Sequence, residues 1–202
     1  MEPIQGNVSI DAQNIMPIIK KWLYSDKDIF IREVVSNGCD AITKLRMVDS
    51  AAAQNCSIHV EVDKAARELR FTDDGIGMTE DEVKTNINQV AFSGAKSFME
   101  EYAKNEDKEN SGIIGHFGLG FYSVFMIADK VTIDTLSFRE GATPVRWESE
   151  DGMAFTMTEG TRTTRGTTIT LHVSEAESEF LEQWRVREVL DRYCSFMSVP
   201  IY

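Results

Sequence analysis

The chain has 202 residues, of which 33 are acidic and 21 are Lys or Arg, so its formal net charge is −12. Binding to a nucleic-acid backbone or an anionic membrane depends on a surplus of positive charge, so this composition argues against both as main partners. Hydrophobic residues make up 42% of the chain, which is enough for the core of one folded domain. The longest apolar stretch, about 121–128, is too short to cross a membrane.

The cysteines and histidines predict neither a disulfide framework nor a metal site. Cys39, Cys56 and Cys194 are widely separated, and the three histidines show no metal-ligand spacing. Unpaired cysteines are typical of a reducing compartment, and the first residues lack the pattern of a secretory signal. We therefore expect a soluble, cytoplasmic protein.

Hydrophobic periodicity predicts helices and strands along the whole chain. Helical spacing of apolar residues predicts helices over about 11–23, 28–52, 79–90, 121–128 and 179–197. Alternating apolar residues predict strands over about 57–63, 68–73, 130–136, 145–149, 154–158 and 167–173. Thr79 and Glu82 have the spacing of a capping box. With no internal repeat or linker-like tract, we expect a single domain, a two-layer α/β (α+β) sandwich with helices on one face of a mostly antiparallel sheet.

The segment of about 91–120 differs in composition from its surroundings. Residues 100–110 hold seven charges, and glycines flank this polar stretch on both sides. Such segments are often functional covers of a site, so we expect a mobile lid here.

The long predicted helix carries a row of polar side chains. Glu33, Asn37, Asp40 and Lys44 follow one another at spacings of four, three and four residues, so they share one face. An ordinary solvated face would show the same pattern. Gly38 in the helix interior costs up to about 1 kcal/mol relative to a better helix former, so we infer that something other than helix stability keeps it there.

Two glycine-containing motifs are candidates for ligand contacts. Asp73-x-Gly75-x-Gly77 follows a predicted strand and combines a carboxylate with a backbone that a ligand can approach, although a tight turn with an Asx hydrogen bond fits equally. The run from Gly115 to Phe121 precedes a predicted helix, where free N–H groups favour an anion; its glycines are alternatively lid hinges. The P-loop, the Rossmann fingerprint and the serine nucleophile elbow are all absent from the sequence.

These motifs occur in the same order in a known family, and the chain resembles the N-terminal ATPase domain of the ninety-kilodalton heat-shock chaperones over essentially its whole length. The runs that carry the resemblance are 24–41, 73–78, 93–98, 115–123 and 165–167. The resemblance implies the Bergerat-type ATP-binding fold that is shared with the ATPase component of DNA gyrase, MutL proteins and sensor histidine kinases. It implies ATP or ADP with Mg²⁺ as the ligands.

The resemblance also implies a role for each matching residue at the adenine. Asp73 would accept a hydrogen bond from the exocyclic amine of the base, for which a carboxylate is a suitable acceptor. Gly77 would let the backbone approach the base, Met78 would form a wall, and Thr167 would join through an ordered water.

At the phosphates, the resemblance assigns the chemistry to the long helix. Asn37 would ligate Mg²⁺, and Glu33 would act as general base toward the attacking water. Arg32 would pair with Glu33 while the site is idle. The remaining nucleotide contacts would come from Asp40, Asn86, Gly118, Leu119, Gly120 and Phe121. Phe92 stands where family members often carry Lys or Arg, so one charged phosphate contact is missing.

The family's middle and C-terminal domains have no counterpart in these 202 residues. We therefore expect residues 1–202 to be an N-terminal nucleotide-binding domain, monomeric by itself and slow in hydrolysis, from a homodimeric chaperone whose partners are client polypeptides and co-chaperones. Two alternatives stay open: another module of the same superfamily, such as a sensor kinase or a MutL- or gyrase-like protein, and a nucleotide-sensing domain without turnover. Glu33 argues against the kinases and against the loss of turnover, and the charge of −12 argues against work on DNA.

Overall fold

The computed structural model of the chain describes residues 27–88 and 120–202. A six-stranded antiparallel sheet with the strand order β1-β2-β6-β3-β4-β5 forms one layer. Its strands are β1 (Ile58–Asp63), β2 (Glu68–Asp73), β3 (Ala128–Leu136), β4 (Val145–Ser149), β5 (Thr156–Glu159) and β6 (Gly166–Val173). The helices are α2 (Ile29–Val48), α3 (Glu80–Asn86), α5 (Gln183–Tyr193) and the 3-10 helices η1 (Gly120–Met126) and η2 (Glu175–Leu181).

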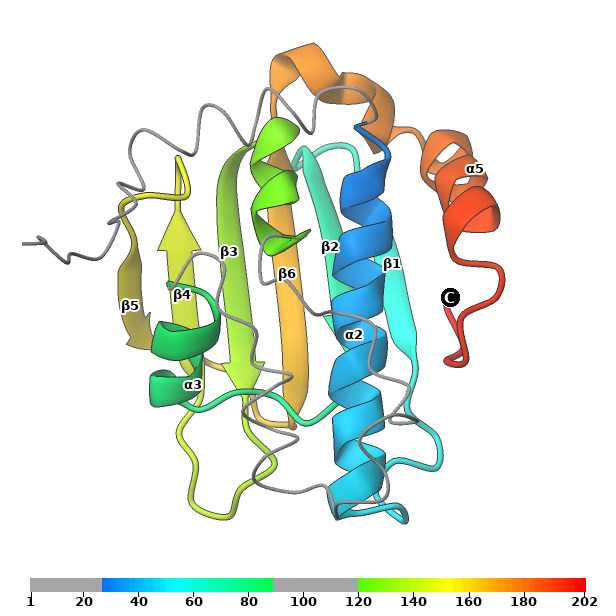
Figure 1. The fold of residues 1–202 in the computed structure, drawn as a ribbon. Coiled ribbons are helices and arrows are strands. Elements are labelled where there is room, and N and C mark those ends of the chain that lie inside the picture. Colours follow the sequence, from blue (N-terminus) through cyan, green and yellow to red (C-terminus); the bar gives the residue numbers. More distant parts are fainter. Residues whose placement is uncertain (1–26, 89–119) are drawn as a thin grey trace, which may run out of the picture.

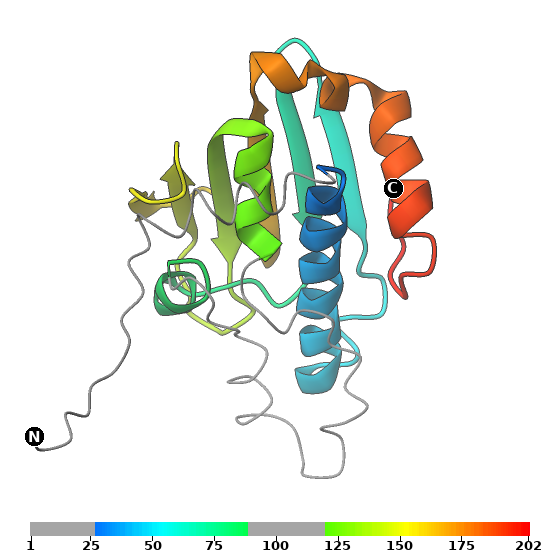
Figure 2. The same cartoon turned by 45° about the horizontal axis from the view of Figure 1, so that its top comes forward.

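The helices α2 and η1 lie side by side on one face of the sheet, and α5 lies beside the edge strand β1 (Figures 1 and 2). The strands show the alternation that this arrangement requires. In β6, Leu171 and Val173 are buried, whereas Thr170 and His172 are partly exposed. One apolar and one polar face are typical of an antiparallel sheet that is covered on one side. The fold class expected from the sequence is confirmed.

The apolar stripe of α2 explains why this helix packs on the sheet. Phe30, Val34 and Ile42 recur at helical spacing and are fully or almost fully buried. The ring of Phe30 meets Phe71 of β2 and Phe180 of η2 edge to face, with centroids 6.4 and 5.1 Å apart. Such aromatic pairs add to the free energy gained by burying apolar area.

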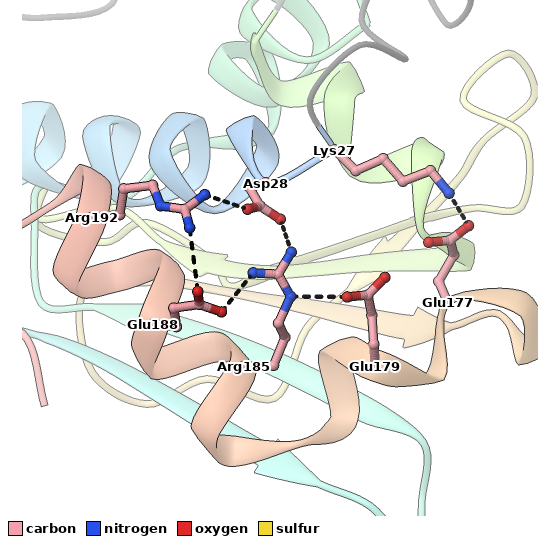
Figure 3. Close-up of polar contacts among 7 residues, drawn as sticks. All are labelled: Lys27, Asp28, Glu177, Glu179, Arg185, Glu188 and Arg192. Atoms are coloured by element: carbon pink, nitrogen blue, oxygen red, sulfur yellow. Dashed lines mark hydrogen bonds and ion pairs between the residues drawn. The ribbon is translucent and has the colours of Figure 1, made fainter.

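An ion-pair network fixes the beginning of α2 against α5 (Figure 3). Asp28 directly precedes α2, and its carboxylate, which is 7% exposed, accepts hydrogen bonds from Arg185 and Arg192 of α5. Arg185 is also paired with Glu179 at 2.9 Å and with Glu188 at 3.1 Å. Because both partners of the Asp28–Arg185 pair are largely buried, removing one of them leaves an uncompensated charge.

Replacing Arg185 with Met is therefore expected to lower the free energy of unfolding by about 3 kcal/mol. The matched control is Arg187→Met on the same helix, where the side chain is exposed and the expected change is below about 0.5 kcal/mol. Denaturant unfolding of both variants at pH 7 measures the difference. Equal losses for the two variants would show that the network does not stabilise the domain.

Several predicted boundaries are wrong. The helix expected over 179–197 is broken, because Glu182 is extended with φ −96° and ψ 119°, and α5 begins only at Gln183. The break lets Phe180 enter the core while Arg185 stacks over its ring at 5.4 Å. The stretch expected as a buried helix over 121–128 is the 3-10 helix η1, and β3 begins after one intervening residue.

The other predicted elements agree with the structure except at their ends. The long helix stops at Val48, α3 stops at Asn86 and β5 begins at Thr156. The capping box of Thr79 and Glu82 is confirmed, with both of its hydrogen bonds present. The three cysteines are buried and unpaired. The helix expected over 11–23, Phe92 and all but the last residue of the expected lid lie outside the described residues. None of the helices in the described ranges has the length and apolar character of a membrane span.

Candidate functional site

The side chains of the polar row on α2 differ in their exposure. Asn37 is exposed, Glu33 is half-buried, and Asp40 is buried with 6% exposure. Burial lowers the pKa of Lys44, and the carboxylates of Asp40 and Glu82 oppose that shift. At the buried part of the row, the charge of Lys44 is therefore balanced by carboxylates. Glu33 and Asn37 remain accessible to a ligand.

Gly120, the first residue of η1, lies directly against Glu33. A Cβ atom at Gly120 would be 2.1 Å from Oε2 of Glu33 and 3.2 Å from its Cβ. No larger residue fits here without displacing the Glu33 carboxylate. The contact brings the start of η1, whose main-chain N–H groups can serve an anion, next to the polar row of α2.

Asp73 ends β2 and pairs in register with Thr167 of β6. Its Oδ1 accepts a hydrogen bond of 2.8 Å from the Gly75 N–H, which is the Asx turn considered from the sequence. Desolvation raises the pKa of Asp73 from 3.8 to about 7, although the N–H groups of Gly75 and Thr167 and the charge of Arg162 oppose the shift. A carboxylate has about four acceptor positions, so the Asx bond leaves room for a further donor.

The turn after Asp73 is held between α2 and the end of β3. The Ile76 N–H donates to the Ala41 carbonyl at 3.1 Å, and the Ile76 carbonyl accepts from the Phe138 N–H at 2.8 Å. Gly77 has φ +64°, and a Cβ there would lie 1.9 Å from the Leu136 carbonyl oxygen. Only glycine can occupy this position. The main chain at Gly77 is consequently fixed where it borders Asp73.

A buried pair of hydroxyl groups connects this turn to β6. Thr135 of β3 accepts a hydrogen bond of 3.0 Å from the Met78 N–H, and its Oγ1 lies 3.0 Å from that of Thr167. The sequence analysis missed Thr135. A signal was present, because Thr135 follows Val131 and Ile133 at inward-facing positions of an alternating strand, where a buried hydroxyl needs a partner.

The remaining predicted site residues differ in their placement. Asn86 is half-buried at the end of α3, and the next carbonyl, that of Ile87, accepts a 2.5 Å hydrogen bond from Tyr122 of η1. The Phe121 ring belongs to the core, 5.8 Å from the Trp147 ring, so only its main chain can contact a ligand. Gly118 and Leu119 lie outside the described residues.

Arg32 does not form the ion pair expected from the resemblance. Its side chain is exposed, and the ion pairs among the described residues include none between Arg32 and Glu33. Burial raises the pKa of Cys194, at the end of α5, to about 11, and Arg32 is the charge that opposes this shift. The charge of Arg32 is therefore felt on the side of α2 that faces the end of α5.

The predicted site residues fall into two groups that differ in their chemistry. Asp73, Gly77 and Thr167 offer an acceptor and a fixed backbone to a ligand that carries an amino donor. Glu33 and Asn37 offer oxygen atoms to a cation or a water molecule. Among residues 27–88 and 120–202, no group of three or more His, Cys, Asp or Glu side chains could hold a metal ion. The amide oxygen of Asn37 is a ligand that Mg²⁺ accepts together with phosphate oxygens and water.

The chain also matches a known protein family. The family of histidine kinase-, DNA gyrase B- and HSP90-like ATPases matches residues 29–151, which include the α2 row, Asp73, Gly77 and the start of η1. The chain therefore belongs to this ATPase family.

Individual curated proteins are also similar to the chain. Chaperone protein HtpG of Porphyromonas gingivalis is 44% identical over an alignment of 202 positions, which covers 98% of this chain and 29% of that protein. The proteins of the same name from Bacteroides thetaiotaomicron and Cupriavidus taiwanensis are 46% and 41% identical, over 98% and 95% of the chain. The chain spans less than a third of the length of these relatives, 29–31%.

Proposed function

We propose that this chain is the nucleotide-binding and ATP-hydrolysing part of a molecular chaperone. The observation that carries the proposal is the carboxyl of Asp73, which desolvation keeps at a pKa of about 7 beside the fixed backbone of Gly77. A hydrogen bond from a ligand donor favours the charged form of a desolvated carboxyl, which makes this carboxyl a suitable acceptor for such a donor. The exocyclic amine of adenine is such a donor.

The adenine half of the site uses four residues of this chain. Asp73 accepts the hydrogen bond from the amine, and Gly77 allows the base to approach the main chain. Met78 borders the base, with its N–H already engaged by Thr135. Thr167, which is buried with 6% exposure, joins through a water molecule.

The phosphate half lies along α2. Asn37 would contribute an amide oxygen to a Mg²⁺ ion bound with the nucleotide, and that ion would neutralise charge on the phosphates. Glu33 takes the proton of the attacking water. Main-chain N–H groups at Gly118, Leu119, Gly120 and Phe121 receive the phosphates, and Asp40 and Asn86 complete the nucleotide contacts. The lid of about 91–120 closes over this half.

The relatives favour the chaperone over the alternatives of a sensor kinase, a MutL- or gyrase-like protein, or a domain without turnover. Their shared name is that of a chaperone. We accordingly assign client polypeptides, co-chaperones and a homodimeric state to a longer protein, and a monomeric state to residues 1–202. The unpaired cysteines fit a place in the cytoplasm.

Calorimetric titration with Mg-ADP tests the proposal. We expect micromolar binding that strengthens as the pH rises from 6 to 8, because the ionised carboxyl of Asp73 is the better acceptor. With a pKa of about 7, the free carboxyl is protonated in about half of the molecules at pH 7. Binding at pH 7 should then release roughly half a proton, measured from the dependence of the heat on buffer ionisation enthalpy.

Absence of Mg-ADP binding to the folded protein between pH 6 and 9 would contradict the proposal. Binding without proton release would show that the carboxyl of Asp73 does not change its ionisation on binding, and the loss of affinity in Asp73→Asn would then be the test of its role.

A further inference from the structure

The side chain of Arg162 reaches from the loop before β6 to the end of β2, where Asp73 lies. Its Nη2 donates hydrogen bonds of 3.3 Å to the main-chain carbonyls of Asp73 and Arg165. Its Nε donates to the Thr164 carbonyl at 3.0 Å, and its Nη1 donates to the Thr168 hydroxyl. One guanidinium, with its fixed fork of donors, thus joins the loop, β6 and β2.

The packing at this point leaves little space. Gly166, the first residue of β6, has φ +112°, and a Cβ there would lie 2.1 Å from the Asp73 carbonyl oxygen and 2.9 Å from Nη2 of Arg162. Next to it, the hydroxyls of Thr168 and Thr72 are 3.1 Å apart. The guanidinium is therefore held close to the main chain of Asp73 by both strands.

We propose that Arg162 is a positioning residue for adenine recognition: its guanidinium fixes the end of β2 and places a positive charge behind Asp73 without touching the nucleotide. The inference rests on the proposed role of Asp73. Arg162 follows no motif in the sequence, and only the fold brings it to this strand end.

The charges around Asp73 support the proposal. Arg162 lowers the pKa of Asp73, whereas the neighbouring carboxylate of Asp74 raises it. From α2, Cys39 also lies near this carboxyl: burial raises the pKa of the Cys39 thiol to about 11, and the charges of Asp40 and, to a smaller extent, Asp73 add to that shift. Loss of the guanidinium should move the pKa of Asp73 further above 7 and weaken binding at neutral pH.

A purely structural role for Arg162 can be separated with a matched residue. Arg67 uses its guanidinium in the same way at the opposite end of β6, donating to the carbonyls of Val173 and Ser174 and to the Ser178 hydroxyl. Removing the Arg67 guanidinium also releases an end of β6, but this end lies six register positions from Asp73 along the sheet.

The experiment is calorimetric titration of Mg-ADP into the wild type, Arg162→Met, Arg162→Lys and Arg67→Met, each at several pH values between 6 and 9. For Arg162→Met we expect about 10-fold weaker binding at pH 7 and a rise of about one unit in the pH midpoint of binding. Arg162→Lys keeps the charge but loses the fork, so we expect about 3-fold weaker binding and an almost unchanged midpoint. Arg67→Met should unfold more easily yet bind within about 2-fold of the wild type.

Wild-type affinity and midpoint in Arg162→Met, with binding still lost in Asp73→Asn, would overturn the inference and leave the proposed site intact. Equal weakening in Arg162→Met and Arg67→Met without a midpoint shift would reduce Arg162 to a structural contact and also overturn it. If the wild type itself did not bind Mg-ADP, the proposed function and the inference would both be wrong. If Arg162→Met does not fold, the test rests on Arg162→Lys. Wild-type affinity in Arg162→Lys would contradict the proposal.

Discussion

Replacing Asp73 with Asn is expected to abolish Mg-ADP binding and, at the same time, to make the nucleotide-free protein more stable at pH 8. Asn has the same shape, and its amide oxygen can still accept the bond from Gly75. It presents no charge to the adenine amine, and its own NH₂ group opposes that amine if the side chain turns. We expect at least a 100-fold loss of affinity, measured by calorimetry.

The stability gain follows from the raised pKa of Asp73. Between the unfolded value of 3.8 and the folded value of about 7, the folded state binds more protons than the unfolded state, so stability falls as the pH rises through this window. The full shift corresponds to at most about 4 kcal/mol above pH 7. Asn carries no such penalty, so denaturant unfolding should show Asp73→Asn gaining about 2 kcal/mol over the wild type from pH 5 to pH 8.

The neighbouring residue supplies the control. Asp74 accepts a 3.4 Å hydrogen bond from the Ser57 hydroxyl and raises the pKa of Asp73. Asp74→Asn should therefore bind Mg-ADP as well as the wild type or slightly better. If Asp74→Asn lost binding and Asp73→Asn kept it, the adenine acceptor would have been assigned to the wrong carboxylate.

Replacing Glu33 with Gln is expected to stop ATP hydrolysis while leaving nucleotide affinity within about 3-fold of the wild type. Loss of a general base typically lowers the rate by 10²–10⁴-fold, and the amide keeps the volume and polarity of the side chain. Phosphate release under single-turnover conditions, with protein in excess over Mg-ATP, measures the rate. Hydrolysis at the wild-type rate would exclude Glu33 as the base.

Gly120→Ala provides a second test of the same carboxylate without changing it. The added Cβ would sit 2.1 Å from Glu33 Oε2, and this flexible end of the side chain must move away. The fold should persist, while hydrolysis falls about 10-fold or more because the base is displaced. Unchanged hydrolysis in Gly120→Ala would mean that the position of Glu33 seen here is not the one in which it acts.

The parts of the fold with clear hydrophobic periods could be predicted from the sequence. The α2 stripe and the alternation of β1, β2 and β4 depend on local spacing, so their bounds were correct to within a few residues. The break at Glu182 was not predictable from local signals, because no Gly or Pro marks it. It arises from tertiary contacts, with Phe180 in the core and Arg185 reaching Asp28.

The same division holds for the candidate site. Asp73 and Gly77 stand in a recognisable motif, and Glu33 and Asn37 share a helix face, so sequence alone could single them out. Gly38 was expected to be kept for function, yet a Cβ there would already lie 3.0 Å from Cδ1 of Ile58, so close packing of α2 on the sheet also requires it. Arg162 could not be found from the sequence, because its contacts depend on how a loop returns to the end of β2.

The strand order also has a consequence for when the site forms during folding. Strands β1 and β2, and likewise β3, β4 and β5, pair with their neighbours in the chain, whereas β6 inserts between these two groups and pairs with β2 and β3. Contacts between distant parts of a chain form slowly, because loop closure precedes them. Asp73 and Thr167 come together only when β6 pairs with β2. A nascent chain that lacks β6 can form the helix α2 and the first hairpin. On the proposed assignment of Asp73 and Thr167 it cannot bind adenine, so we expect recovery of nucleotide binding to mark the end of refolding rather than its onset.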